Sequence, residues 1–253
     1  SKLYEYNANI RGDFKDHPVD KSLKLKVGAQ VMIVKNDLNN PRRWVNGTLA
    51  IVEKLSKDVI KGLFGELFTL KSLVESASSN DVSDILLSWK GPFDKGHDFE
   101  LGLKNIEVKT KDISKQIIKI SSEFQLEYED EKSLELLVLS VQNDYINGKS
   151  ISELVSEIKA LVVNKLGDFS IVLNALNQKS ITQKNIYQYD NFRFKAIEQV
   201  IYDCNSDFPK LTQSNTETAI KSIKYSLILS YLDEFILSKE KLDCNFKWRI
   251  MNR

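Results

Sequence analysis

The residues of this sequence best suited to chemistry lie in the stretch His97–Thr110, which reads HDFELGLKNIEVKT. Glu107 follows Asp98 by nine positions, and Lys109 follows Glu107 after a single apolar residue. Two carboxylates, completed by waters and a phosphate oxygen, suit a hard cation such as Mg²⁺ or Mn²⁺. Such an ion polarises a phosphodiester and activates water, while an ammonium orients that water or offsets developing charge. The pattern therefore indicates a metal-dependent phosphodiesterase site.

This chemistry requires a β-hairpin to position the three side chains. Residues i and i+2 of a strand point to the same face, so Glu107 and Lys109 should project together while Val108 turns to a packed face. Asp98 should come from the preceding strand, paired through a short turn near Gly102. The stretch therefore predicts two antiparallel strands with the polar side chains on one side.

The arrangement D-x(n)-E-x-K on a hairpin resembles the PD-(D/E)XK nuclease superfamily. Three flanking segments, Gly62–Phe68, Trp89–Pro92 and Ile120–Leu126, resemble one bacterial subfamily of it that is associated with restriction and phage-defence loci. The resemblance spans about residues 55–240. It implies an α/β (α+β) fold with a restriction-endonuclease-like core, in which helices flank a central mixed sheet. It also implies a Mg²⁺-dependent DNA endonuclease of restriction or phage-defence type.

The resemblance extends the site beyond the hairpin. Glu66, on the expected first helix, becomes a third metal ligand, although a carboxylate on the helix surface is the alternative. Gln125 becomes a residue that orients the attacking water or contacts phosphate. Lys90 and Lys111 are candidate DNA contacts, with solvated lysines as the alternative reading. His97 is more readily explained as a structural residue than as a general base, because the sequence shows no partner for it.

Residues 1–56 have a different character and form a separate predicted segment, followed by the nuclease-like domain at 57–253. Residues 1–57 carry 11 Lys and Arg against 6 Asp and Glu. Residues 4–56 resemble the small β-barrel of Pif-type and RecD-type DNA helicases. No phosphate loop of the form G-x-x-x-x-G-K-[ST] occurs, so a helicase motor is not expected. Arg42 and Arg43 either contact DNA or are solvated turn residues.

Hydrophobic periodicity predicts the remaining elements. A helix should start at a Ser56 cap and run to about Glu75, and another should span Ile151–Val162. Strands are expected at Gln116–Ile120 and Leu134–Val141, with a turn at Thr110–Asp112. Ile85–Trp89 fits a short strand or a helix end, and Ile220–Ile236 fits core of undecided type. Ile181–Ala196, which mixes aromatic and basic residues, fits an alternating strand or a DNA-gripping segment.

The 253 residues are 42% hydrophobic and carry a net charge of +1, which fits a soluble globular protein. There is no apolar run of the roughly 20 residues that a membrane helix needs, and no signal peptide, so we expect no membrane and a cytoplasmic location. The two cysteines lack the spacing of a zinc site or disulfide framework. Expected partners are DNA, a defence-system ATPase or methyltransferase, and a second copy of the chain. The alternatives to an enzyme are a non-catalytic DNA-binding or assembly module and a helicase-associated accessory fragment.

Overall fold

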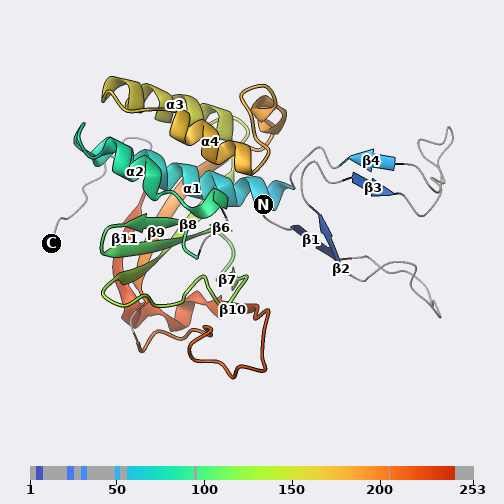
Figure 1. Ribbon diagram of the computed structural model, residues 1–253, viewed down its shortest axis with the longest axis vertical. Coiled ribbons are helices and arrows are strands. Elements are labelled where there is room, and N and C mark those ends of the chain that lie inside the picture. Colours follow the sequence, from blue (N-terminus) through green and yellow to red (C-terminus); the bar gives the residue numbers. More distant parts are fainter. Residues whose placement is uncertain are drawn as a thin grey trace.

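The computed structural model describes residues 56–93, 96–204 and 206–242, together with four short strands nearer the N-terminus (Figure 1). Its helices are α1 (Lys57–Ser76), α2 (Val82–Ser88), α3 (Ile151–Asn164) and α4 (Ser170–Gln178), with short 3-10 turns η1 (Gly91–Phe93), η2 (Ile186–Tyr189), η3 (Leu229–Tyr231) and η4 (Asp233–Phe235). The strands that follow α1 are β5 (Phe99–Leu101), β6 (Lys104–Asp112), β7 (Ile117–Ile120), β8 (Ser133–Asn143), β9 (Phe194–Asp203), β10 (Tyr225–Ile228) and β11 (Ile236–Lys241).

The centre of the fold is a mixed five-stranded sheet in the order β11-β9-β8-β6-β5. Strands β6 and β8 run parallel, and the other neighbours in this sheet are antiparallel. Both β6 and β8 are largely buried, as expected for strands with both faces covered. This confirms the predicted restriction-endonuclease-like α/β architecture.

The two faces of the sheet are covered differently (Figure 1). The helices gather on one face, where α1 lies on β6 and α3 packs against α1, and their apolar residues form the larger core. The small β7–β10 sheet covers part of the other face, and it encloses a second core with β8 and β9. The second core includes Ile120, Leu136 and Tyr202. The hairpin β5–β6 lies at one edge of the central sheet.

Helix α1 begins where the sequence predicts, because the Ser56 hydroxyl accepts a hydrogen bond from the Val59 N–H and caps the first turn. Its apolar stripe, including Leu63, Leu67 and Leu70, is fully buried. Gly65 faces strand β6, where an added Cβ would overlap the Thr110 side chain. The missing side chain lets the helix approach the strand that carries the candidate catalytic residues.

Two predictions of local structure were wrong, and a third is decided between its alternatives. Thr110–Asp112 is not a turn: β6 continues to Asp112, paired with β8, because Asp112 binds Lys61 of α1 at 3.0 Å. For Ile85–Trp89 the alternatives were a short strand or a helix end, and the helix end is confirmed, because Ile85–Ser88 belongs to helix α2. Ile181–Ala196 is not one strand, because reciprocal hydrogen bonds between Thr182 and Asn185 start the turn η2, and β9 begins only at Phe194. These differences arise from partners that are distant in sequence or from local side-chain bonds.

The predicted strands Gln116–Ile120 and Leu134–Val141 and the helix at Ile151–Val162 are confirmed within a few residues. The undecided segment Ile220–Ile236 is mixed: it holds β10, η3 and η4. Nearer the N-terminus, β1 (Tyr4–Asn7) pairs with β2 (Ser22–Leu25), and β3 (Gln30–Met32) pairs with β4 (Leu49–Ile51). The division at residue 56 and the barrel resemblance remain predictions.

Candidate active site

The hairpin β5–β6 positions Asp98 beside Glu107. The loop between the strands is Gly102-Leu103, and Gly102 takes the positive φ of +55° that such a tight turn requires. Phe99 pairs with Ile106, so one further step of the same register brings Asp98 alongside Glu107. The Asp98 carboxylate accepts a hydrogen bond from the Val108 N–H at 2.9 Å. Its backbone carbonyl accepts from the N–H groups of Lys90 and Gly91, which fixes the residue from both sides.

Glu107, Lys109 and Gln125 form a connected group. The Lys109 ammonium lies 2.8 Å from Glu107 Oε1 and 3.0 Å from Gln125 Oε1. The same Gln125 oxygen accepts a hydrogen bond from the Ser121 N–H at 2.7 Å. The Glu107 side chain is almost fully buried, whereas that of Lys109 is 15% exposed. The ammonium is therefore held in one place while keeping access to solvent.

His97 is buried against the backbone of Gln125. Its Nδ1 lies 3.2 Å from the backbone carbonyl oxygen of Gln125, and its Nε2 lies 3.8 Å from Glu129 Oε1. The imidazole therefore contacts the segment that presents Gln125 to Lys109. This placement suits a supporting residue better than a general base, which would need access to a substrate proton.

Glu66 approaches Asp98 from helix α1 and carries a partner that the sequence did not suggest. The indole of Trp89 donates to Glu66 Oε2 at 3.0 Å, and Lys179 Nζ lies 3.1 Å from Glu66 Oε1. The Glu66 and Lys179 side chains are only 6% and 4% exposed. Lys179 follows directly after α4, and no motif marked it, because its role depends on a contact 113 residues away.

Gly91 is the point at which two candidate ligands converge. A Cβ on this residue would lie 2.5 Å from Glu66 Oε2 and 2.6 Å from Asp98 Oδ1. Both carboxylates therefore press against the glycine backbone, and any side chain there would displace them. The turn Trp89–Pro92 therefore redirects the chain into β5 and, through Gly91, leaves room for the Glu66 and Asp98 carboxylates.

The predicted DNA contacts are dispersed. Lys90 lies beside Asp98 through its backbone, and Lys111 is buried on β6 beyond Lys109. Arg42 and Arg43 lie outside the described residues. Among the predicted basic residues that the structure describes, Lys90 and Lys109 lie nearest to the hairpin carboxylates.

The carboxylates fit a divalent cation by their chemistry. Asp98 and Glu107 are hard oxygen donors on adjacent strands, and Mg²⁺ commonly takes one or two carboxylates and completes its shell with water and substrate phosphate. Within residues 56–93, 96–204 and 206–242, no group of three His, Cys, Asp or Glu side chains is arranged to hold an ion. Asp98 and Glu107 are thus the two predicted ligands on the hairpin. Glu66 lies beside Asp98 at Gly91 while it is bonded to Lys179 and Trp89, and its role as a third ligand remains a prediction.

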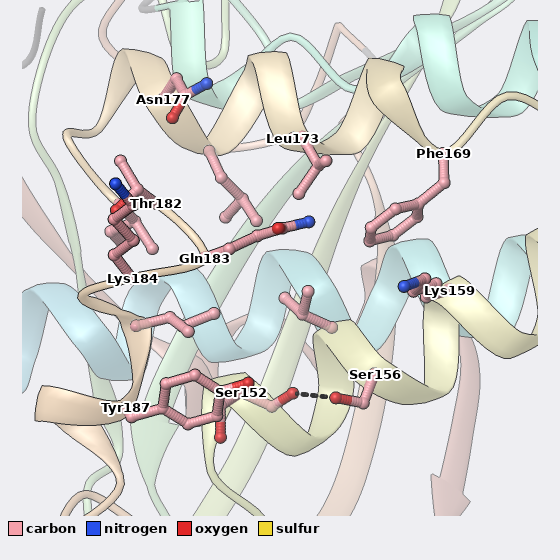
Figure 2. A pocket seen from close by; sticks show the side chains of 14 residues that line it. Ser152, Ser156, Lys159, Phe169, Leu173, Asn177, Thr182, Gln183, Lys184 and Tyr187 are labelled. Carbon is pink, nitrogen blue, oxygen red and sulfur yellow. Dashed lines mark hydrogen bonds between the residues drawn. The ribbon is translucent and has the colours of Figure 1, made fainter.

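A separate hollow of about 700 Å³ lies on the helical side, between α3, α4 and the segment Ile181–Tyr187 (Figure 2). Figure 2 shows Phe169 and Tyr187 at different parts of this hollow, with Lys159 on α3. Tyr187 is 65% exposed, whereas Tyr189 is buried in the core. None of the predicted catalytic or metal-binding residues lines this hollow. It is therefore a feature distinct from the hairpin site.

The hairpin, the mixed sheet and the helix that brings Glu66 to them define a PD-(D/E)XK nuclease-like fold. In agreement, residues 34–230 match the family DUF4420, which is described as a candidate PD-(D/E)XK family member, and the chain belongs to this family. Comparison with curated proteins and with solved structures gave no match.

In the described part of the chain, no helix is long and apolar enough to cross a membrane.

Proposed function

We propose that this protein is a metal-dependent deoxyribonuclease that hydrolyses DNA phosphodiester bonds with Mg²⁺ or Mn²⁺. The observation that carries the proposal is the group at the hairpin, where the Lys109 ammonium is held by Glu107 and Gln125 beside Asp98. A purely structural hairpin gains little from a buried carboxylate and a lysine at this position, because desolvation offsets much of their attraction. Hydrolysis of a phosphodiester, in contrast, needs the carboxylate as a ligand for the ion and the lysine as a charge that balances the phosphate oxygens.

In this proposal each side chain has a defined role. Asp98 and Glu107 hold the ion, which when bound polarises the scissile phosphate and lowers the pKa of a water. Lys109 neutralises charge that develops on the phosphate oxygens, and it stays in place because Glu107 and Gln125 fix its ammonium. Glu66, which lies beside the same Gly91 as Asp98, is the proposed third ligand. The hairpin therefore supplies preorganised charge at one edge of the sheet.

The substrate in this proposal is double-stranded DNA in the cytoplasm, cut internally by an enzyme of restriction or phage-defence type. Lys90, Arg42 and Arg43 are proposed phosphate contacts, whose binding strength should fall as salt rises. Cutting both strands with one site per chain calls for a second copy of the chain, so we propose a homodimer. An ATPase or methyltransferase of the same defence locus is the proposed protein partner.

The direct test is cleavage of supercoiled plasmid DNA by the purified protein, with Mg²⁺, with Mn²⁺ and with EDTA. We expect nicked or linear products with either ion and none with EDTA. Glu107→Gln and Lys109→Met should each lower the cleavage rate by at least about 100-fold, as for loss of a charge-stabilising group. Lys104→Met is a matched control, because Lys104 lies on the same strand but is 46% exposed.

Two results would contradict the proposal. Cleavage that persists in both Glu107→Gln and Lys109→Met would place the activity elsewhere or in a contaminant. Salt-sensitive DNA binding without any cleavage in Mg²⁺ or Mn²⁺ would instead support a non-catalytic DNA-binding module that retains the nuclease fold.

A further inference from the structure

A second hollow lies on the face of the central sheet opposite the helices, at the far end of β6 from the hairpin loop. Its volume is about 580 Å³, within the range of small-ligand sites. Its floor is apolar and aromatic, formed by Val138, Val200 and Tyr202 of β8 and β9. Lysines from two strands also line it: Lys111 from β6, and Lys239 and Lys241 from β11. The hollow thus combines a surface for a flat apolar group with several cations.

Lys111 is the unusual member of this lining. It is only 8% exposed, and among the residues that the structure describes its ammonium has no hydrogen bond and no carboxylate within 4.0 Å. Desolvation lowers its pKa, and nearby Lys239 adds to this, although Glu198 and Asp112 oppose it. Only its aliphatic stem is enclosed, because the ammonium keeps access to the open space of the hollow. A cation that is accessible from a concave site and has no partner among the described residues can take an anionic ligand.

The acidic residues of the hollow do not replace that partner. Glu198 lies 3.6 Å from Lys239, so its charge is shared with another lysine. Asp233 lines the hollow beside Tyr202, and burial together with the Asp233 and Glu198 carboxylates raises the pKa of Tyr202 to about 12. The lining therefore holds three lysines against two carboxylates, and Lys111 remains available to an anion.

Strand geometry relates this hollow to the candidate active site. Lys109 and Lys111 are two residues apart on β6, so their side chains leave the same face of the sheet about 6.6 Å apart along the strand. The two lysines are close, but they have different neighbours.

We infer that this hollow binds a phosphate group through Lys111, with Lys239 and Lys241 at its rim and Tyr202 beneath the group attached to the phosphate. The phosphate has two possible sources, a DNA strand or a free nucleotide. The inference rests on the proposed function only where DNA is the source.

The test uses the full chain with Glu107→Gln as background, without divalent metal, so that cleavage cannot interfere. The probes are inorganic phosphate, adenosine monophosphate and a 12-nucleotide single-stranded DNA, each titrated while the melting temperature is followed. We expect at least one probe to raise the melting temperature and Lys111→Met to weaken its binding at least about tenfold. Lys119→Met, on the exposed side of β7, is the matched control and should bind like the background protein.

The same variants test whether Lys111 is present for a ligand or for folding. Without ligand, Lys111→Met should melt at the same or a higher temperature, because it breaks no ion pair with a described residue and keeps a buried stem of similar volume. Saturation by adenosine monophosphate and not by the oligonucleotide identifies a free nucleotide, and the reverse identifies the DNA strand. Equal binding by Lys111→Met and the background protein, or no binding of any probe, overturns the inference.

The result can be separated from that of the proposed function. If the wild-type protein cuts DNA but shows no Lys111-dependent binding, only the inference fails. If Lys111-dependent binding is found in a protein that never cuts DNA, the inference holds and the deoxyribonuclease proposal fails.

Discussion

Replacement of Lys179 by methionine should destabilise the protein far more than replacement of an ordinary surface lysine. Lys179 neutralises Glu66 at 3.1 Å, and both side chains are more than nine-tenths buried. Removal of one member of a buried ion pair leaves the other charge uncompensated, which typically costs about 3–5 kcal/mol. For a domain of this size we expect Lys179→Met to lower the melting temperature by roughly 6–20 °C. Urea unfolding followed by circular dichroism measures the loss directly.

A double-mutant cycle separates the ion pair from other effects of the substitution. Glu66→Gln combined with Lys179→Met removes both charges, so the double variant should be more stable than the sum of the single losses predicts, by about 2 kcal/mol. Lys71→Met is the control, because Lys71 pairs with Glu75 and Glu157, whose side chains are 38% and 35% exposed, and pairs that are open to solvent contribute only about 0–1 kcal/mol each. If Lys179→Met costs no more than Lys71→Met, or if the single losses simply add, the pair does not hold Glu66 in place.

Three further predictions concern the site and its support. Gly91→Ala should abolish metal-dependent cleavage of plasmid DNA because its Cβ would displace the Glu66 and Asp98 carboxylates, whereas Gly96→Ala, which has open space around it, should cut normally. Gln125→Leu should reduce the cleavage rate by at least about tenfold at saturating metal, because Lys109 loses the oxygen that positions it, whereas an unchanged rate would remove Gln125 from the site. The pKa of Asp112 is lowered, because the hydrogen bond and charge of Lys61 together outweigh the effect of desolvation. The ionised carboxylate therefore stabilises the folded state above its unfolded pKa, and this stabilisation is lost as pH falls through the folded pKa. In urea titrations, the stability difference between wild type and Asp112→Asn should therefore shrink steadily below about pH 4, and a difference that is constant with pH would contradict this.

Local spacing was sufficient to predict the hairpin and the first helix. The two-residue period of Glu107 and Lys109, the Gly102 turn and the Ser56 cap all act over a few residues, so the sequence alone contains the information. The resemblance to a nuclease superfamily then supplied Glu66 and Gln125, neither of which any local pattern marks as functional. Their neighbours in the structure give each of them a specific contact.

The features that sequence analysis missed depend on distant partners. Lys179 meets Glu66 across 113 residues, and nothing near it suggests an ionic partner. The extension of β6 to Asp112 depends on Lys61 of α1 and on pairing with β8, which outweigh the polar composition that suggested a turn. The hollow around Lys111 is formed by four strands and an intervening loop, so it exists only in the folded sheet.

The pairing of β7 with β10 has a consequence for the order of events during synthesis. Gln125 follows β7, and β7 pairs with residues 225–228, about a hundred residues further along the chain. Strand pairs with such separation form late, because loop closure must precede them. On the ribosome, the hairpin after Asp98 can form long before β10 has been made. Strand β7, which precedes Gln125, the hydrogen-bond partner of Lys109, lacks its own partner strand until β10 emerges. A nascent chain should therefore carry an incomplete candidate site until most of the domain has emerged, so any chemistry at that site has to wait for the C-terminal strands.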